Sequence, residues 1–179
     1  YNMRRKRVME VEPNSAHFNI AELEKKYNVN IITQNIDDLH ERAGSKNVLH
    51  LHGEILYAKS SNPETLHNNE AYFPIEKGEI KLGESCENGY QLRPHVVWFG
   101  EPVPNLSIAE KIVEEADFLL VIGTSLNVYP AANLIHYTNP KCKLFLIDPN
   151  NVKFSHDLNV KVIQENATEG IKTFINLIK

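Results

Sequence analysis

Two continuous apolar runs, "FLLVIG" at residues 118–123 and "KLFLID" at residues 143–148, constrain the fold more than any other feature of the chain. A strand that is covered on both faces shows no polar alternation, so such runs are typical of the central strands of a parallel sheet. Helical patterns separate several strand-like runs, and this alternation favours an α/β fold with helices on both faces of the sheet. The other strand-like runs lie at residues 30–33, 48–52, 95–99 and 160–163.

The segment of residues 57–93 departs from this alternation. It is polar, contains Gly78, Gly83 and Gly89, and shows no sustained hydrophobic period. A stretch of this kind inside a compact domain is typical of an insertion. Because 179 residues suit one domain, we expect a single domain over residues 1–179 that contains a small insertion subdomain.

Charge and cysteine content exclude several classes of function. The net charge of −4 gives the chain no general attraction to nucleic acid or anionic membranes. No apolar run approaches the roughly 18 residues that are needed to span a bilayer. Cys86 and Cys142 are too few and too far apart for a disulfide framework or a zinc pattern. We therefore expect a cytoplasmic protein that binds no metal, no nucleic acid and no membrane.

Small polar residues follow several of the predicted strands. Ligands of open parallel sheets bind at the carboxyl ends of the strands, so these residues predict a site at one edge. Each motif alone also has a structural explanation, since "GTS" at residues 123–125 can form a turn and Asn35 or Asp37 can cap a helix. The hydrogen-bonding residues and glycines at the strand ends are Gln34, Asn35, Asp37, His52, Gly53, Gly100, Glu101, Gly123, Thr124, Ser125, Asp148 and Asn150.

The sequence "HLHGE" at residues 50–54 places two histidines one residue apart. In a strand, His50 and His52 would lie on one face and could share a metal, but the cysteines do not supply the further ligands of a zinc site. A histidine at a strand end is suited to act as a general base, because imidazole titrates near neutral pH. We therefore predict that His52, beside Gly53, is the base and that His50 is structural.

Four motifs, taken together, resemble those of the sirtuins, a family of NAD-dependent protein-lysine deacylases. The motifs are "TQNIDDLHERAG", "LHLHGE", "LRPHVVWFGE" and "GTSLNVYPAA", in this order. The resemblance extends over essentially the whole chain and is weakest over residues 57–90. It implies a Rossmann-like fold, NAD as the cofactor, acyl-lysine proteins or peptides as substrates, and nicotinamide and O-acyl-ADP-ribose as products.

The resemblance also implies roles for individual residues. His52 is implied to be the general base. The residues implied to bind NAD are Gln34, Asn35, Asp37, Gly123, Thr124, Ser125, Asp148, Asn150 and Ala167. Those implied to hold the substrate peptide as an added strand are Val97, Phe99, Gly100, Glu101 and Tyr129.

The first residues of the chain, "YNMRR", indicate the kind of acyl group. Tyr1 and Arg4 resemble the pair that marks sirtuins with a preference for acidic acyl groups such as succinyl or malonyl. Arg4 can grip a carboxylate through two parallel hydrogen bonds, and Tyr1 can add a third. Without the resemblance, Arg4 would be interpreted as a solvated member of the basic run at residues 4–7.

The chain departs from the sirtuin pattern in two ways. Most sirtuins carry two cysteine pairs that bind a structural zinc between the second and third motifs, but this interval contains only Cys86. We therefore expect the insertion to be free of zinc. The family's first strand and its glycine-rich "GAG" phosphate loop would precede Tyr1, and no two glycines of the chain are separated by one residue. We therefore expect a fragment of a longer sirtuin or a truncated gene product.

The sequence leaves three hypotheses for the function. The first is an NAD-dependent protein-lysine deacylase. The second is a catalytically silent module that binds NAD, ADP-ribose or acyl-peptides, because the phosphate loop is absent. The third is an unrelated α/β nucleotide-binding protein.

Overall fold

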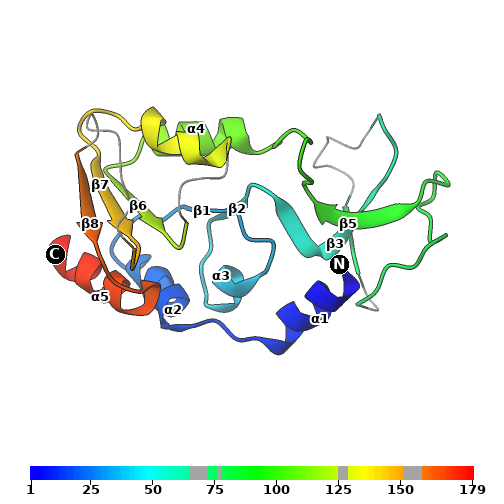
Figure 1. Cartoon of the computed structure of the whole chain (residues 1–179), viewed down its shortest axis with the longest axis horizontal. Helices are drawn as coiled ribbons and strands as arrows, with labels where there is room; N and C mark the ends of the chain where they lie inside the picture. The colour runs from blue at the N-terminus through cyan, green and yellow to red at the C-terminus, as the bar shows by residue number, and fades with distance from the viewer. Residues whose placement is uncertain (65–71, 76–77, 125–128, 151–158) are drawn as a thin grey trace.

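The computed structural model describes residues 1–64, 72–75, 78–124, 129–150 and 159–179 (Figure 1). Its helices are α1 (Asn2–Glu10), α2 (Ser15–Leu23), α3 (Leu39–Arg42), α4 (Leu106–Glu114), the 3-10 helix η1 (Ala131–Tyr137) and α5 (Ala167–Leu177). Its strands are β1 (Ile31–Thr33), β2 (Val48–His50), β3 (Gly53–Ser60), β4 (Tyr72–Pro74), β5 (Leu92–Val96), β6 (Phe118–Ile122), β7 (Lys143–Ile147) and β8 (Val160–Ile163). Within the described ranges, no helix combines the length and the hydrophobicity needed to cross a bilayer.

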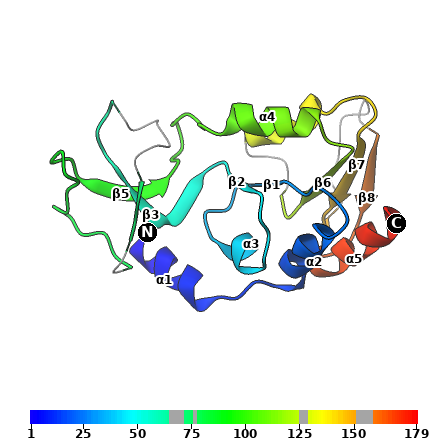
Figure 2. The ribbon, with the colours of Figure 1, turned by 180° about the vertical axis from the view of Figure 1, so that it is seen from behind.

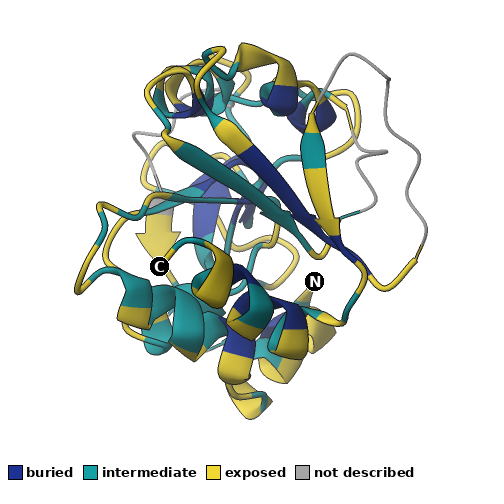
Figure 3. Cartoon of the chain, turned by 90° about the vertical axis from the view of Figure 1, so that its left-hand side faces the viewer, coloured by how far each residue is buried: buried dark blue, intermediate teal, exposed yellow. Residues whose placement is uncertain are grey.

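The parallel sheet of β6, β7 and β8 contains both of the continuous apolar runs. Phe145 and Ile147 of β7 pack with Ile171 and Phe174 of α5 in one buried core, to which α2 also contributes. The helix approaches the sheet so closely that a Cβ at Gly170 would overlap the Ile147 side chain. Figure 3 shows helices on both sides of these strands. The prediction of parallel strands covered on both faces is therefore confirmed.

The second parallel sheet contains only β1 and β2 among the described strands, in a register that pairs Ile31 with Val48 and Thr33 with His50. It is not hydrogen-bonded to β6. A cavity of about 660 Å³ lies between the two parallel sheets and is lined by residues of both β1 and β6.

The third sheet is antiparallel, in the order β4–β3–β5, and lies at the end of the molecule opposite β8 (Figures 1 and 2). The run at residues 95–99 was expected to be a strand of the parallel sheet, and this expectation is wrong. The strand spans Leu92–Val96 and pairs with β3, so that Glu54 lies opposite His95. Because β3 begins at Gly53, the sheet extends beyond residues 57–93. The division of the chain into a domain and an insertion subdomain stays a prediction.

Candidate active site

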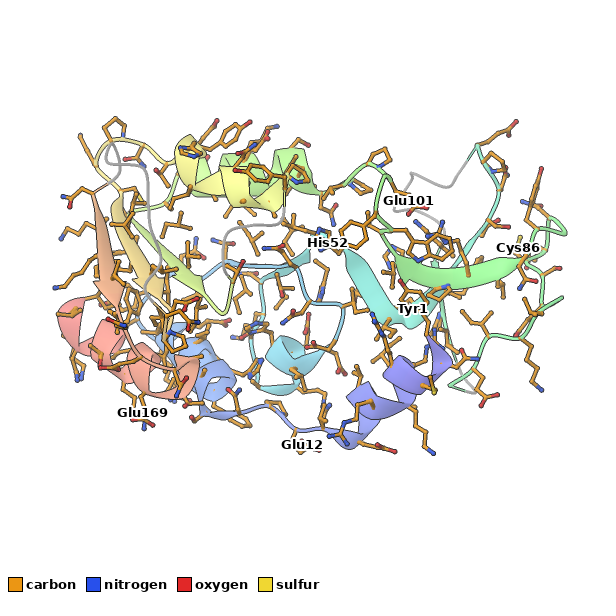
Figure 4. The ribbon with its side chains drawn as sticks, viewed as in Figure 1. Tyr1, Glu12, His52, Cys86, Glu101 and Glu169 are labelled. Atoms are coloured by element: carbon orange, nitrogen blue, oxygen red, sulfur yellow. The ribbon has the colours of Figure 1, made fainter. Side chains whose placement is uncertain are left out.

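His52 lies at the bend between β2 and β3, near the middle of the molecule (Figure 4). Its Nδ1 is 3.1 Å from the backbone carbonyl oxygen of Gln34, which follows β1. A carbonyl oxygen only accepts hydrogen bonds, so Nδ1 carries a hydrogen, and in the neutral ring the lone pair is therefore on Nε2. Nε2 has no hydrogen-bond partner among the residues that the structure describes, and the side chain is partly exposed. This tautomer is the one that a general base requires.

Gly53 fixes the position of the base because it allows β3 to approach β5. Its φ is +79°, in the left-handed region that favours glycine. A Cβ at this position would overlap the carbonyl oxygen of His95. Immediately beside it, the N–H of Val97 donates to the carbonyl oxygen of His52 across 2.9 Å. The backbone of the predicted base is therefore held between β3 and the end of β5.

His50 is held on both sides of its ring. Its Nδ1 is 3.1 Å from the carbonyl oxygen of Asn35, and its Nε2 is 2.8 Å from Oε1 of Glu41 on α3. The side chain is 8% exposed. His50 therefore has no free ring nitrogen. The sequence suggested that both histidines lie on one face of a single strand. In the structure, β2 ends at His50 and the chain then bends, so His52 lies outside that strand.

Four of the residues predicted to bind NAD line the cavity between the parallel sheets. Gln34 and Asn35 follow β1, and Gly123 and Thr124 follow β6, so these polar residues gather at the carboxyl ends of the two strands. The strands themselves supply mainly apolar lining. His52 does not line this cavity, but it is bonded to Gln34, which does.

The other residues predicted to bind NAD lie elsewhere or have local partners. Asp37 accepts a hydrogen bond from the N–H of Leu39 across 3.2 Å, in the manner of a residue that caps a helix. Asp148 is buried after β7 and accepts from the N–H of Asn150 across 2.7 Å. Ala167 is the first residue of α5. None of these lines the cavity, and Ser125 lies outside the described residues.

The loop after β5 contains most of the residues predicted to hold a peptide. Phe99 is fully exposed, and Gly100 turns the chain with a φ of +90°. Glu101 is instead engaged within the protein, because the Arg93 guanidinium donates to Oε1 across 2.6 Å and to Oε2 across 3.1 Å. The N–H of Trp98 donates to the same carboxylate across 2.9 Å. Glu101 therefore holds the loop in shape.

The charge of Glu101 is stabilised by these bonds. Burial by itself raises the pKa of this carboxyl group, but the hydrogen bonds from Arg93 and from the Trp98 N–H outweigh burial and lower its pKa. On β5, the pKa of His95 is lowered to about 4, first by burial and then by the charges of Lys59, His50 and Arg93. His95 is therefore neutral at neutral pH.

Tyr1 and Arg4 lie beside this loop. The rings of Tyr1 and Trp98 stack with centroids 6.4 Å apart, and the Arg4 guanidinium carbon lies 5.8 Å from the Tyr1 ring centroid. Arg4 is exposed, whereas the neighbouring Arg5 is buried and donates to the carbonyl oxygen of Ile55 across 2.7 Å. Arg5 thus anchors α1 on β3, and Arg4 stays exposed on the outer side of the helix. Figure 4 shows Tyr1 and Glu101 on the same side of His52.

The sequence model of the Sir2 family matches residues 1–130 of the chain. The chain belongs to the Sir2 family. The resemblance to the sirtuins is therefore confirmed. Among its relatives, a protein of Bacteroides thetaiotaomicron named NAD-dependent protein deacylase is 47% identical over 179 residues, which cover 99% of this chain and 76% of the relative. A Helicobacter pylori protein of the same name is 47% identical over 172 residues, or 96% and 71% of the two chains.

Solved Sir2 structures share the fold. A Sir2 homologue in complex with NAD superposes with a TM-score of 0.85 at 35% identity, over 99% of this chain and 69% of that one. A Sir2 complex with a p53 peptide and NAD+ superposes with a TM-score of 0.75 at 30% identity, over 95% and 72% of the two chains. The Rossmann-like α/β fold expected from the sequence is therefore confirmed.

Sequence reasoning missed three residues that shape this Sir2 site. Arg93 holds Glu101 and lies with its guanidinium carbon 3.5 Å from the Trp98 ring centroid, and Glu41 holds His50. The motif containing Arg93 and Trp98 was recognised, but the bond from Arg93 to Glu101 spans the turn at Gly100. One sequence signal could have indicated the ion pair of Arg93 and Glu101. These opposite charges stand at the two ends of one short apolar run.

In the part of the chain that the structure describes, no group of three or more histidine, cysteine, aspartate and glutamate residues could hold a metal ion. Cys86 and Cys142 are both free. The absence of zinc stays a prediction.

Proposed function

We propose that this chain contains the catalytic site of an NAD-dependent protein-lysine deacylase, which releases nicotinamide and O-acyl-ADP-ribose. One observation carries this proposal. The Gln34 carbonyl holds the Nδ1 hydrogen of His52, which leaves Nε2 available as a base beside the polar end of the cavity. The names of the relatives from Bacteroides and Helicobacter support the same activity.

The residues at the polar end of the cavity fit the nicotinamide and ribose end of NAD in chemistry. The amide side chains of Gln34 and Asn35 would orient the carboxamide end of the cofactor, with Asp37 beside them. Backbone at Gly123 and the hydroxyl of Thr124 would hold ribose and phosphate groups. Asp148, Asn150 and Ala167 are proposed for the adenosine half, and Ser125 for the phosphates.

NAD supplies the ribose that accepts the acyl group when nicotinamide leaves. The chain's own contribution is to orient the reactants and to move one proton. His52 would take a proton on Nε2 from a ribose hydroxyl, and the resulting imidazolium would stay bonded to the Gln34 carbonyl through Nδ1. The carboxylate of Asp37 would stabilise positive charge that develops near the leaving group.

The loop after β5 is proposed to bind the substrate peptide. Val97, Phe99 and Gly100 would offer backbone and an exposed ring to an extended peptide that adds as a strand, together with the exposed Tyr129. Glu101 contributes by keeping the loop in shape. The solved Sir2 complex with a p53 peptide supports a peptide as the substrate class.

The acyl group is proposed to be acidic, such as succinyl or malonyl. Tyr1 and Arg4 lie together at the edge of the peptide loop, through the stacking of Tyr1 on Trp98. A carboxylate at the end of the acyl chain would accept two hydrogen bonds from the Arg4 guanidinium. An acetyl group would leave Arg4 without this partner.

The proposal is tested by mixing the protein with NAD and matched acetyl-lysine and succinyl-lysine peptides. Release of nicotinamide in step with deacylated peptide is the expected result. Deacylated peptide without nicotinamide, or no product from any acyl peptide under conditions where the protein is folded, would contradict it.

For the cellular location, we propose the cytoplasm, where a reducing environment suits the two free cysteines.

A further inference from the structure

Two histidines hold two consecutive carbonyl groups of the segment that follows β1. His52 Nδ1 contacts the Gln34 carbonyl oxygen and His50 Nδ1 contacts the Asn35 carbonyl oxygen, each across 3.1 Å. The two rings differ at Nε2, since that of His50 meets the Glu41 carboxylate at 2.8 Å. This difference gives the two histidines different tasks.

The His50 ring bridges the backbone after β1 and the carboxylate of α3. The Asn35 carbonyl can only accept, so Nδ1 donates to it. On the other side of the ring, Nε2 meets the Glu41 carboxylate in a site where the histidine is buried. Glu41 therefore fixes the orientation in which His50 donates to Asn35.

Of the titratable groups around His50, Glu41 is bonded to its ring. His40 on α3 and His95 on β5 have a lowered pKa, chiefly because of burial. Burial raises the pKa of Glu54 on β3.

The hydrogen bonds around Glu41 and His50 hold the backbone of Asn35. The N–H of Asn35 donates to Oγ1 of Thr33 across 3.1 Å, and the Asn105 side chain donates to the His50 carbonyl oxygen across 2.8 Å. Asn35 is thus held at its N–H by β1 and at its carbonyl by His50, while its side chain is exposed at the cavity. The Glu41–His50 pair links this backbone to α3.

We propose that Glu41 and His50 form a positioning pair that fixes the backbone of Asn35, and with it the nicotinamide end of the NAD site. The proposal rests on the proposed function. His50 is not a second base. It sets how well the segment of residues 34–37 is ordered to receive NAD, whereas His52 is held independently by Gln34.

The first test is Glu41→Gln, which keeps the size and an acceptor oxygen but removes the charge. Because a hydrogen bond involving a charged group is weakened, we expect KM for NAD to rise about tenfold, while kcat at saturating NAD stays within about twofold. Glu22→Gln is the matched control, since Glu22 loses the same charge in an exposed pair with Lys25, and it should change neither constant. An unchanged KM for NAD in Glu41→Gln would overturn the proposal.

The second test compares His50→Asn with His50→Leu. Asparagine can donate from the place of Nδ1 to the Asn35 carbonyl, whereas leucine cannot, so the rise in KM for NAD should be smaller for His50→Asn. Adding Glu41→Gln to His50→Asn should raise KM no further, because the pair is already broken. Additive effects, or equal losses in both His50 variants at unchanged melting temperature, would contradict the role.

Two measurements separate this proposal from the proposed function. The nitrogen NMR signals of the His50 ring should change in Glu41→Gln, whereas those of His52 should not. Calorimetric Kd values for NAD should follow the same order as the KM values. If the unaltered protein binds NAD but forms no nicotinamide, the deacylase function is wrong. The Kd values for NAD still test whether Glu41 and His50 position the NAD site. Nitrogen signals of His50 that Glu41→Gln leaves unchanged, or an unchanged Kd for NAD, would overturn the pair, as would failure of the unaltered protein to bind NAD.

Discussion

Gly53 lies against the carbonyl group of His95 so closely that any side chain at residue 53 would overlap the carbonyl oxygen. This contact joins β3 to β5 directly beside the predicted base. Replacement by alanine adds both this overlap and the strain of a left-handed φ of +79°. We expect Gly53→Ala to lower the free energy of unfolding by more than about 2 kcal/mol and to reduce kcat.

Gly44→Ala is the matched control for this prediction. Gly44 has a φ of +103°, but a Cβ there meets no atom within 4 Å. It should cost only the strain of about 1 kcal/mol and leave kcat unchanged. Equal losses of stability in the two variants, measured by urea unfolding, would show that the contact with His95 has no effect.

The bond between Arg93 and Glu101 predicts a dependence of stability on pH. The pKa of Glu101 is lowered in the folded protein, so its ion pair stabilises the fold above the ordinary carboxyl pKa and is lost as the pH falls through the lowered value. We expect Glu101→Gln to lower the free energy of unfolding by about 1.5–3 kcal/mol at neutral pH. Its difference from the unaltered protein should shrink in acid.

Urea unfolding at several pH values checks this expectation. Glu10→Gln is the control, because Glu10 and Arg7 form an exposed pair at 3.7 Å that should contribute less than about 1 kcal/mol. A deficit in Glu101→Gln that stays constant from neutral pH to acid would contradict the role assigned to the charge.

Arg4→Met tests the acyl preference. Loss of the bidentate partner should lower kcat/KM for a succinyl-lysine peptide by about ten- to a hundredfold, since hydrogen bonds to charged groups contribute roughly 1.5–3 kcal/mol. Deacetylation of a matched peptide should change little. Lys6→Met removes a charge from the same exposed helix and should leave both activities intact. Equal loss of both activities in Arg4→Met would make Arg4 structural.

Metal analysis tests the prediction for the insertion. The purified protein should contain no stoichiometric zinc, and a chelator should leave its melting temperature unchanged. A structural zinc contributes strongly to folding, so its removal would be obvious. One zinc per chain, or a fall in melting temperature with chelator, would refute this part of the account.

The local sequence pattern was enough to predict the strands of the main sheet. Continuous apolar runs such as "FLLVIG" and "KLFLID" are typical of parallel strands that are buried on both faces. It was not enough for residues 95–99. There the apolar run continues past Val96, but the turn at Gly100 and the bond from Arg93 to Glu101 end the strand. Hydrophobic period does not encode such a contact between residues on two sides of a turn.

The candidate site was likewise predicted only in part from the sequence. The strand ends at Gln34, Asn35, Gly123 and Thr124 were predicted together and do line one cavity, because the carboxyl ends of parallel strands share an edge. The pairing of His50 with Glu41 was not predicted, since it depends on how α3 packs against β2. Motif residues identify a site, whereas their hydrogen-bond partners come from tertiary structure.

The most direct test of the account is the turnover number of His52→Ala at saturating NAD and acyl-peptide. Loss of a general base should lower kcat by about 10²–10⁴-fold. The melting temperature and the Kd for NAD should stay close to those of the unaltered protein, because the side chain is partly exposed and lies outside the cavity lining. His50→Asn, measured in parallel, should keep most of its kcat. Turnover by His52→Ala equal to that of His50→Asn would contradict the assignment of His52 as the base.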